Sequence, residues 1–99
     1  MSAAANPARG ETRLFDWILR PTFGALVAAE EELGSLFALV ERAAAGSLKL
    51  SEMVGLFWHC LQDETGLTRE ELGEAVAKAG LAAVTPALKM LIEQILAGR

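Results

Sequence analysis

His59 and Cys60 are the residues best suited to chemistry, because the chain has no other histidine and no other cysteine. A thiol and an imidazole can act together as nucleophile and base when their side chains meet. Here the two are neighbours in LSEMVGLFWHC, a stretch with helical periodicity, and consecutive side chains of a helix diverge by about 100°. We therefore expect a surface histidine and a packed cysteine, no catalytic residue and no enzymatic activity.

The run of three glutamates at 30–32 raises the question of a metal site. Hard cations need several oxygen ligands that converge from a loop, whereas Glu31 and Glu32 fall on the polar side of a predicted helix. We expect no metal and no cofactor. Glu30 falls inside the apolar stripe instead, where a carboxylate needs a partner. We predict an ion pair between Arg20 and Glu30, with a partner-binding role for Glu30 as the alternative.

Composition places these residues in one small soluble domain. The chain has 99 residues, 53% of them hydrophobic, and a net charge of −4 from nine basic and thirteen acidic residues. No basic stripe is present to bind nucleic acid, and we find neither a signal peptide nor an apolar run long enough to span a membrane. A lone cysteine fits a reducing compartment. We expect a cytoplasmic protein with a flexible arm at 1–10 and a single helical domain at 11–99.

Residues 11–20 are expected to form an extended segment. They carry five large apolar side chains without a helical repeat. A turn at Asp16 would make a hairpin of very short strands, which is marginal unless it packs on the rest of the chain. Pro21 ends the segment, because a proline disfavours the helical conformation at the preceding residue.

Two short helices are expected next. Thr22 is a suitable N-cap for a helix at 23–33, and Gly34 supplies its end. Ser35 can cap a second helix that continues to Gly46. The apolar stripe of the first helix is predicted to consist of Phe23, Leu26, Val27 and Leu33.

Three further helices complete the prediction. The third begins at Ser51 and has the clearest apolar periodicity, so it should be the central one. The fourth begins with a capping box of Thr68 and Glu71. The fifth is placed at 83–97, which keeps Pro86 in the first turn, where no amide donor is required. The fold class is mainly α: a compact bundle of about five short helices with a short N-terminal extended segment or β-hairpin.

Some apolar side chains exceed what one core stripe needs. Ile92 and Leu96 form a second ridge on the last helix, and Met90 points nearly opposite its core stripe. Phe15 and Trp17 add aromatic rings in the extended segment. Because excess apolar surface is either packed internally or offered to a partner, these five residues form the candidate partner surface.

A helix-turn-helix is an alternative interpretation of the third and fourth helices, which DETG connects. The second helix of such a pair must enter the major groove of DNA. Its charged residues are Arg69, Glu70, Glu71, Glu74 and Lys78, so its net charge opposes the phosphates. We expect no nucleic-acid partner.

Five features together resemble the small tail assembly proteins of gene transfer agents and related long-tailed phages, which are grouped among phage tail assembly chaperones. They are RGE at 9–11, LRPTFGAL at 19–26, Glu30 followed by LG at 33–34, the apolar run of the third helix, and LTREELGEAV at 67–76. The family motif corresponds to Arg20, Pro21, Thr22, Phe23, Gly24, Glu30 and Gly34. Family members usually have a fuller hairpin with a glycine-containing turn, which this sequence lacks.

The resemblance implies a non-enzymatic helper that binds the tape measure protein, a long, helical and aggregation-prone chain, until tail tube subunits polymerise around it. The tail tube protein is a second candidate partner. Some family members are labelled tail tube proteins, but a tube subunit needs a continuous β-sheet and this chain offers at most one short hairpin. The alternatives are a minor structural component retained in the particle and a small helical regulator.

Overall fold

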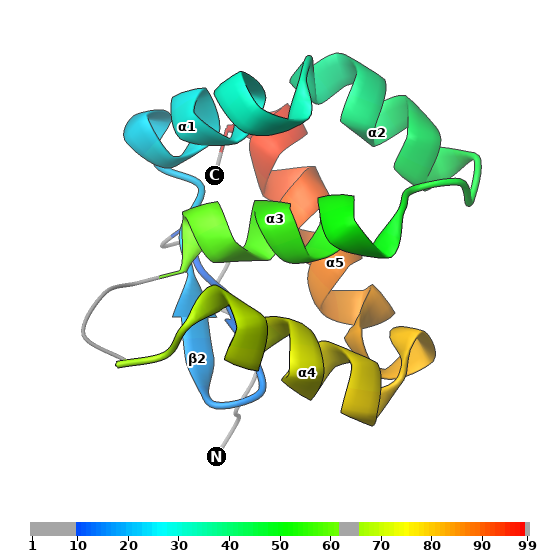
Figure 1. The fold of residues 1–99 in the computed structure, drawn as a ribbon. Coiled ribbons are helices and arrows are strands. Elements are labelled where there is room, and N and C mark those ends of the chain that lie inside the picture. The colour runs from blue at the N-terminus through cyan, green and yellow to red at the C-terminus, as the bar shows by residue number, and fades with distance from the viewer. Residues whose placement is uncertain (1–9, 62–65, 99) are drawn as a thin grey trace.

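The computed structural model describes residues 10–61 and 66–98, which form five helices and one β-hairpin (Figure 1). The elements are β1 (Thr12–Leu14), β2 (Trp17–Leu19), α1 (Phe23–Leu33), α2 (Leu36–Ala44), α3 (Leu50–Cys60), α4 (Arg69–Ala79) and α5 (Leu81–Ala97). This architecture confirms the expected mainly α fold, and of the two alternatives for the N-terminal segment, extended chain or β-hairpin, the structure has the hairpin. Residues 1–9 of the expected flexible arm lie outside the described residues. Residues 62–65, which include the first three residues of DETG, also lie outside them.

The hairpin has two three-residue strands in antiparallel pairing, with Thr12 opposite Leu19 and Leu14 opposite Trp17. Two residues remain for the turn, and the first of them, Phe15, has a φ of 56°. Glycine, asparagine or aspartate usually occupies such a position, because a larger side chain is strained at positive φ. The hairpin therefore forms without the glycine of the family pattern, at the cost of local strain.

Contacts on both sides stabilise this short hairpin. Leu19 forms an isolated β-bridge with Leu61, and the Arg20 amide donates to the Cys60 carbonyl over 2.7 Å. On the other side the Thr12 hydroxyl donates to Gln94 Oε1 over 3.0 Å, and Gln94 Nε2 donates to the Glu11 carbonyl over 2.7 Å. The hairpin is thus fixed between α3 and α5, as an isolated two-stranded ribbon requires.

Helix α3 is the central element, as its periodicity predicted. It crosses the middle of the molecule in Figure 1, with α1 and α2 on one side, α4 on the other and α5 behind, and it packs directly on α1 and α4. Its buried residues are Met53, Val54, Gly55, Leu56, Phe57 and Cys60. They join Leu14 and Leu19 of the hairpin with Leu72 and Leu91 of the later helices in one hydrophobic core.

Local capping signals place most helix ends correctly. The Thr22 hydroxyl accepts a hydrogen bond from the Ala25 amide over 3.1 Å, and α1 ends at Gly34 as predicted. Thr68 and Glu71 form the predicted capping box, with the Glu71 carboxylate accepting from the Thr68 amide over 2.9 Å. These bonds satisfy amides that would otherwise lack a partner in the first turn of each helix.

The predicted apolar stripe of α1 is wrong at two of its four residues, Phe23 and Val27, which are exposed. Phe23 is 84% exposed, whereas Ala29 is fully buried and Leu26 and Leu33 are half-buried. The neighbouring elements cover only part of α1, because Ala25 and Leu26 of the first turn pack against the core whereas Phe23 and Val27 are exposed. A shared helix face therefore does not bury all of its members.

The predicted start of α3 differs by one residue. The helix begins at Leu50 rather than Ser51, with Lys49 as its N-cap. The cap is made by Glu52, whose carboxylate accepts from the Lys49 amide over 3.0 Å. A carboxylate in the first turn also interacts favourably with the helix dipole, which favours a start at Leu50.

The predicted start of α5 at residue 83 is also wrong, because the helix begins at Leu81 and contains Pro86. Pro86 cannot donate to the Ala82 carbonyl, but both residues are exposed, so water can satisfy that carbonyl. The helix thus tolerates proline on its outer side.

No single described helix is long and apolar enough to span a membrane. Helices α4 and α5 reach the required length and hydropathy only when they are taken together, and the chain bends by 117° between them.

Candidate partner-binding surface

The apolar side chains of α2 are concentrated on one face of the helix more than those of the other helices are. Little of that face is nevertheless buried. Leu39 is its one buried residue. Leu36 and Val40 are half-buried, and Phe37 is 77% exposed. An amphipathic helix normally covers its apolar face with a neighbour, so the face of α2 is available to a partner.

Helix α5 forms the opposite wall of a groove along this face. One part of the groove lies between α1, α2 and α5 and is lined by Leu26, Glu30, Leu36, Phe37, Val40, Ile95 and Leu96. The other part is lined by Val40, Ala43, Ala44, Thr85, Leu88, Lys89, Ile92, Glu93 and Leu96. Because Val40 and Leu96 line both parts, we treat them as one continuous surface, the α2–α5 groove.

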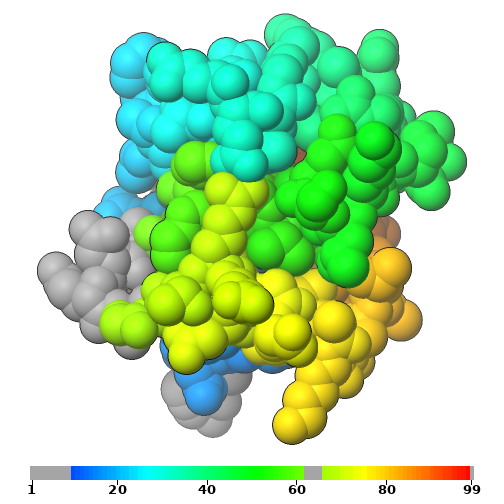
Figure 2. Space-filling model, in the orientation of Figure 1, coloured from blue at the N-terminus to red at the C-terminus, as the bar shows by residue number. Residues whose placement is uncertain are grey.

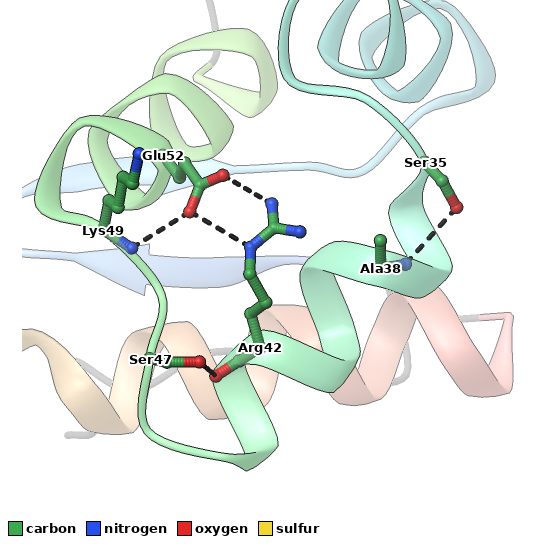
Figure 3. A network of polar contacts seen from close by, with 6 residues as sticks. All are labelled: Ser35, Ala38, Arg42, Ser47, Lys49 and Glu52. Atoms are coloured by element: carbon green, nitrogen blue, oxygen red, sulfur yellow. Dashed lines mark hydrogen bonds and ion pairs between the residues drawn. The ribbon is translucent and has the colours of Figure 1, made fainter.

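A polar network fixes the far end of α2 to the start of α3 (Figure 3). The Arg42 guanidinium forms an ion pair and hydrogen bonds with the Glu52 carboxylate, and the Ser47 hydroxyl donates to the Arg42 carbonyl over 3.3 Å. The hydrogen bond from the Lys49 amide, and then those from Arg42, hold the pKa of Glu52 below its ordinary value. These contacts set the position of one wall of the groove.

A second hollow lies where the hairpin turn meets α4. Its lining consists of Phe15, Asp16, Trp17, Ala75, Lys78 and Ala79. The rings of Phe15 and Trp17 are in edge-to-face contact, with centroids 5.6 Å apart and planes at 83°. Phe15 is 39% exposed, so the strained turn presents an aromatic side chain at the surface.

The candidate partner residues thus divide between two surfaces that share no lining residue. Ile92 and Leu96 lie in the α2–α5 groove, and Phe15 and Trp17 lie in the hairpin hollow. Met90 is half-buried and lines neither of them. Sequence reasoning missed the contribution of α2, although Phe37 and Val40 belong to its apolar stripe.

The predicted ion pair between Arg20 and Glu30 is wrong. Both residues are exposed, and Glu30 Oε2 accepts instead from the Leu36 amide over 3.1 Å. Glu30 therefore helps to cap α2 across the sharp turn after α1. Arg20 precedes α1, whereas Glu30 lies about 10 Å along its axis from Phe23 at 1.5 Å per residue, which separates the two charges.

The remaining motif residues have local structural roles. Pro21 and Thr22 form the connection from β2 to α1 and line a shallow hollow together with Gln94 and Gly98. Gly24 lies in the exposed first turn of α1. Gly34 adopts a φ of 92°, which favours glycine, and this permits the short connection between α1 and α2.

A polar cluster on the other side of α1 connects three helices. Arg69 Nη1 and Nη2 donate to Glu32 Oε1 and Oε2 over 2.8 and 2.5 Å, and His59 Nε2 lies 2.7 Å from Glu32 Oε1. Figure 2 shows the side chains of α4, in yellow, reaching those of α1, in cyan. Gly55 provides the space for the Arg69 side chain, since a Cβ at residue 55 would lie only 2.8 Å from Arg69 Nη2.

This cluster is an electrostatic contact between helices rather than a catalytic arrangement. The hydrogen bonds from Arg69, and then that from His59, lower the pKa of Glu32 to about 2, so the carboxylate is a weak base. Burial raises the pKa of the Cys60 thiol to about 12, which keeps it a protonated, packed side chain. Among the described residues, no three His, Cys, Asp or Glu side chains gather as a metal site would require.

Replacing Glu32 with glutamine should lower the stability by about 1 kcal/mol at neutral pH, a value kept small because the carboxylate is 40% exposed. The folded-state pKa lies below the unfolded value of about 4.3. The contribution of Glu32 is therefore complete above about pH 4.3 and is lost as the pH falls towards 2. Urea denaturation of the two proteins at pH 7 and pH 3 tests this, since the difference should shrink at pH 3. Glu31→Gln is the matched control and should have little effect.

Comparison with known proteins supports a tail-associated origin. Residues 13–98 match the family described as phage tail tube protein, GTA-gp10. No curated protein and no solved structure matches this chain. The family match covers the hairpin apart from Thr12, the five helices and both candidate surfaces. The chain therefore belongs to the phage tail tube protein, GTA-gp10, family, a tail protein family of phages and gene transfer agents.

Proposed function

We propose that this protein is a non-enzymatic tail assembly chaperone that binds the tape measure protein in the cytoplasm of the host cell. The observation that carries the proposal is the open α2–α5 groove. A groove with apolar walls formed by two helices suits the apolar stripe of an amphipathic helix. The resemblance to tail assembly chaperones implies a client of this kind, since it points to a long, helical and aggregation-prone tape measure protein.

Phe37 and Leu96 are the proposed anchor residues of the groove. They are 77% and 57% exposed and lie on opposite walls, α2 and α5. Large apolar side chains at the centre of an interface usually supply most of the binding free energy. The described residues contain one two-stranded sheet with three residues in each strand, which supports a helper role over a subunit of a sheet-lined tube.

Co-expression with the tape measure protein from the same gene cluster tests the proposal. We expect the tape measure protein to become soluble and to elute together with this protein in size-exclusion chromatography. A tape measure protein that stays insoluble while this protein elutes alone would contradict the chaperone function.

Leu96→Glu should abolish co-elution or weaken binding at least about tenfold, because it places a charge in the apolar groove. Leu81→Glu is the matched control: it is the same substitution in the same helix at a residue of similar exposure, 51%, outside the groove. The amount of soluble tape measure protein in each co-expression is the measurement. Equal effects of the two substitutions on binding would mean that the tape measure protein does not bind in the α2–α5 groove.

The family description favours a second candidate function. A family described as a tail tube protein is consistent with a structural component that is retained in the particle. Quantitative mass spectrometry of purified particles separates the two functions. A stoichiometric amount of this protein in particles supports the structural function, whereas its absence from particles together with binding to the tape measure protein supports the chaperone.

A further inference from the structure

The outer face of α5 in the α2–α5 groove has a regular pattern. Thr85, Lys89, Ile92 and Leu96 follow one another at helical spacing and all line the groove. Lys89 and Glu93 flank Ile92 on this face and are exposed. The apolar residues therefore lie next to one positive and one negative side chain that are four residues apart.

Lys89 and Glu93 form no ion pair with each other or with another residue in the described part of the chain. A charge of each sign at positions four apart on one helix face is complementary to the same face of an antiparallel copy. The midpoint of the two positions is residue 91. A two-fold axis at that level places Lys89 of each copy opposite Glu93 of the other, so that two equivalent ion pairs form.

We propose that, when no client is bound, a second copy of this chain covers the α2–α5 groove through antiparallel pairing of the two α5 helices about this axis. Ile92 lies one residue from the axis and contacts Ile92 of the second copy. A helix that lies beside α5 in the groove also contacts α2, so Val40 and Phe37 gain a cover. The pairing uses the groove assigned in the proposed function, and the client must displace the second copy to bind.

The charges favour a second copy over an unrelated helix. A general client needs only an apolar stripe, and the groove would accept many of these. The reciprocal Lys89 and Glu93 pattern adds a requirement that an antiparallel α5 meets twice in one interface. Charge complementarity of this kind fixes the register and the partner.

Sedimentation equilibrium of the full chain without a client tests the pairing. We expect a monomer–dimer equilibrium, and we expect Lys89→Glu and Glu93→Lys each to raise the dissociation constant at least about tenfold. The double substitution, Lys89→Glu with Glu93→Lys, restores both ion pairs with reversed signs and should return the dissociation constant to within about threefold of the original. Glu74→Lys on α4, at an exposed residue that lines neither candidate surface, is the matched control for the change in net charge of Glu93→Lys and should leave the dimer unchanged.

Disulfide crosslinking gives a second measurement that does not depend on the charge variants. Ile92→Cys should give a covalent dimer on oxidation, since the two residues lie beside the axis. Cys60 is buried, at 1% exposure, and does not compete. Glu74→Cys, at an exposed residue of α4 outside both candidate surfaces, should remain monomeric on a non-reducing gel.

Three results would overturn the pairing. They are a monomeric protein at roughly millimolar concentration, a double variant that dimerises no better than the single variants, and equal crosslinking at positions 92 and 74. A monomer that still solubilises the tape measure protein would overturn the pairing and leave the chaperone function in place. A dimer that fails to solubilise the tape measure protein would overturn the chaperone function and leave the pairing in place.

Discussion

Replacing Phe57 with alanine should lower the free energy of unfolding by about 3–5 kcal/mol. Phe57 lies in the middle of α3 with none of its surface exposed, and it is the largest of the fully buried side chains. Truncation removes its apolar contacts and leaves a cavity between helices that can close only in part. Because small domains have a total stability of about 5–15 kcal/mol, much of the protein should unfold at moderate urea concentrations.

Phe23→Ala is the matched control, because it removes the same atoms from a side chain that is 84% exposed. It should change the stability by no more than about 0.5 kcal/mol. Urea denaturation followed by circular dichroism gives both values. A large effect at Phe23 or a small effect at Phe57 would mean that α1 and α3 are packed differently from the structure described above.

Helix ends could be predicted from the sequence because capping is local. Thr22, Gly34 and Thr68 act within one turn of their own helices, and each has the expected role. The extended segment could be predicted for a similar reason, since apolar residues without a helical repeat precede Pro21, whereas the hairpin remained one of two alternatives. Exceptions arose where another local group took over, as Glu52 did at the start of α3.

Contacts between distant segments could not be predicted from periodicity. A helical wheel shows which residues share a face, but it does not show which part of that face a neighbour covers, and this is why Phe23 and Val27 were misplaced. Glu30 was paired with the wrong group because the sharp turn to α2 brings the Leu36 amide to its carboxylate. Glu32 and Arg69 are 37 residues apart, and only the packed helices bring them together.

The candidate surface was predicted in part for the same reason. The excess of apolar residues on α5 indicated Ile92 and Leu96, and both lie in the α2–α5 groove. The matching wall on α2 was missed, because a complete apolar stripe normally indicates burial. Whether a neighbouring helix covers Phe37 and Val40 depends on the orientation of α2 relative to that helix. This orientation cannot be predicted from a local sequence pattern.

Gln94→Leu should lower the stability by about 2–4 kcal/mol, although it replaces a polar side chain by an apolar one of similar size. Gln94 is 3% exposed and is the buried polar connection between α5 and the hairpin. Leucine would leave the Glu11 carbonyl and the Thr12 hydroxyl without the hydrogen bonds that they now form with Gln94. Buried polar groups without partners are costly, so the hairpin should detach first.

Gln94→Glu should be still more destabilising at pH 7, by roughly 3–5 kcal/mol, and its effect should depend on pH. The carboxylate would place a charged oxygen beside the Glu11 carbonyl, which now accepts from Gln94 Nε2 over 2.7 Å. Only the protonated acid can donate to that carbonyl, so folding should raise the pKa of the new carboxyl above its unfolded value of about 4.3. The penalty should therefore be complete above the raised pKa and should shrink as the pH falls towards 4.3. Urea denaturation of variant and parent protein from pH 7 to pH 4 measures this difference, and a difference that does not change with pH would mean that residue 94 is open to water.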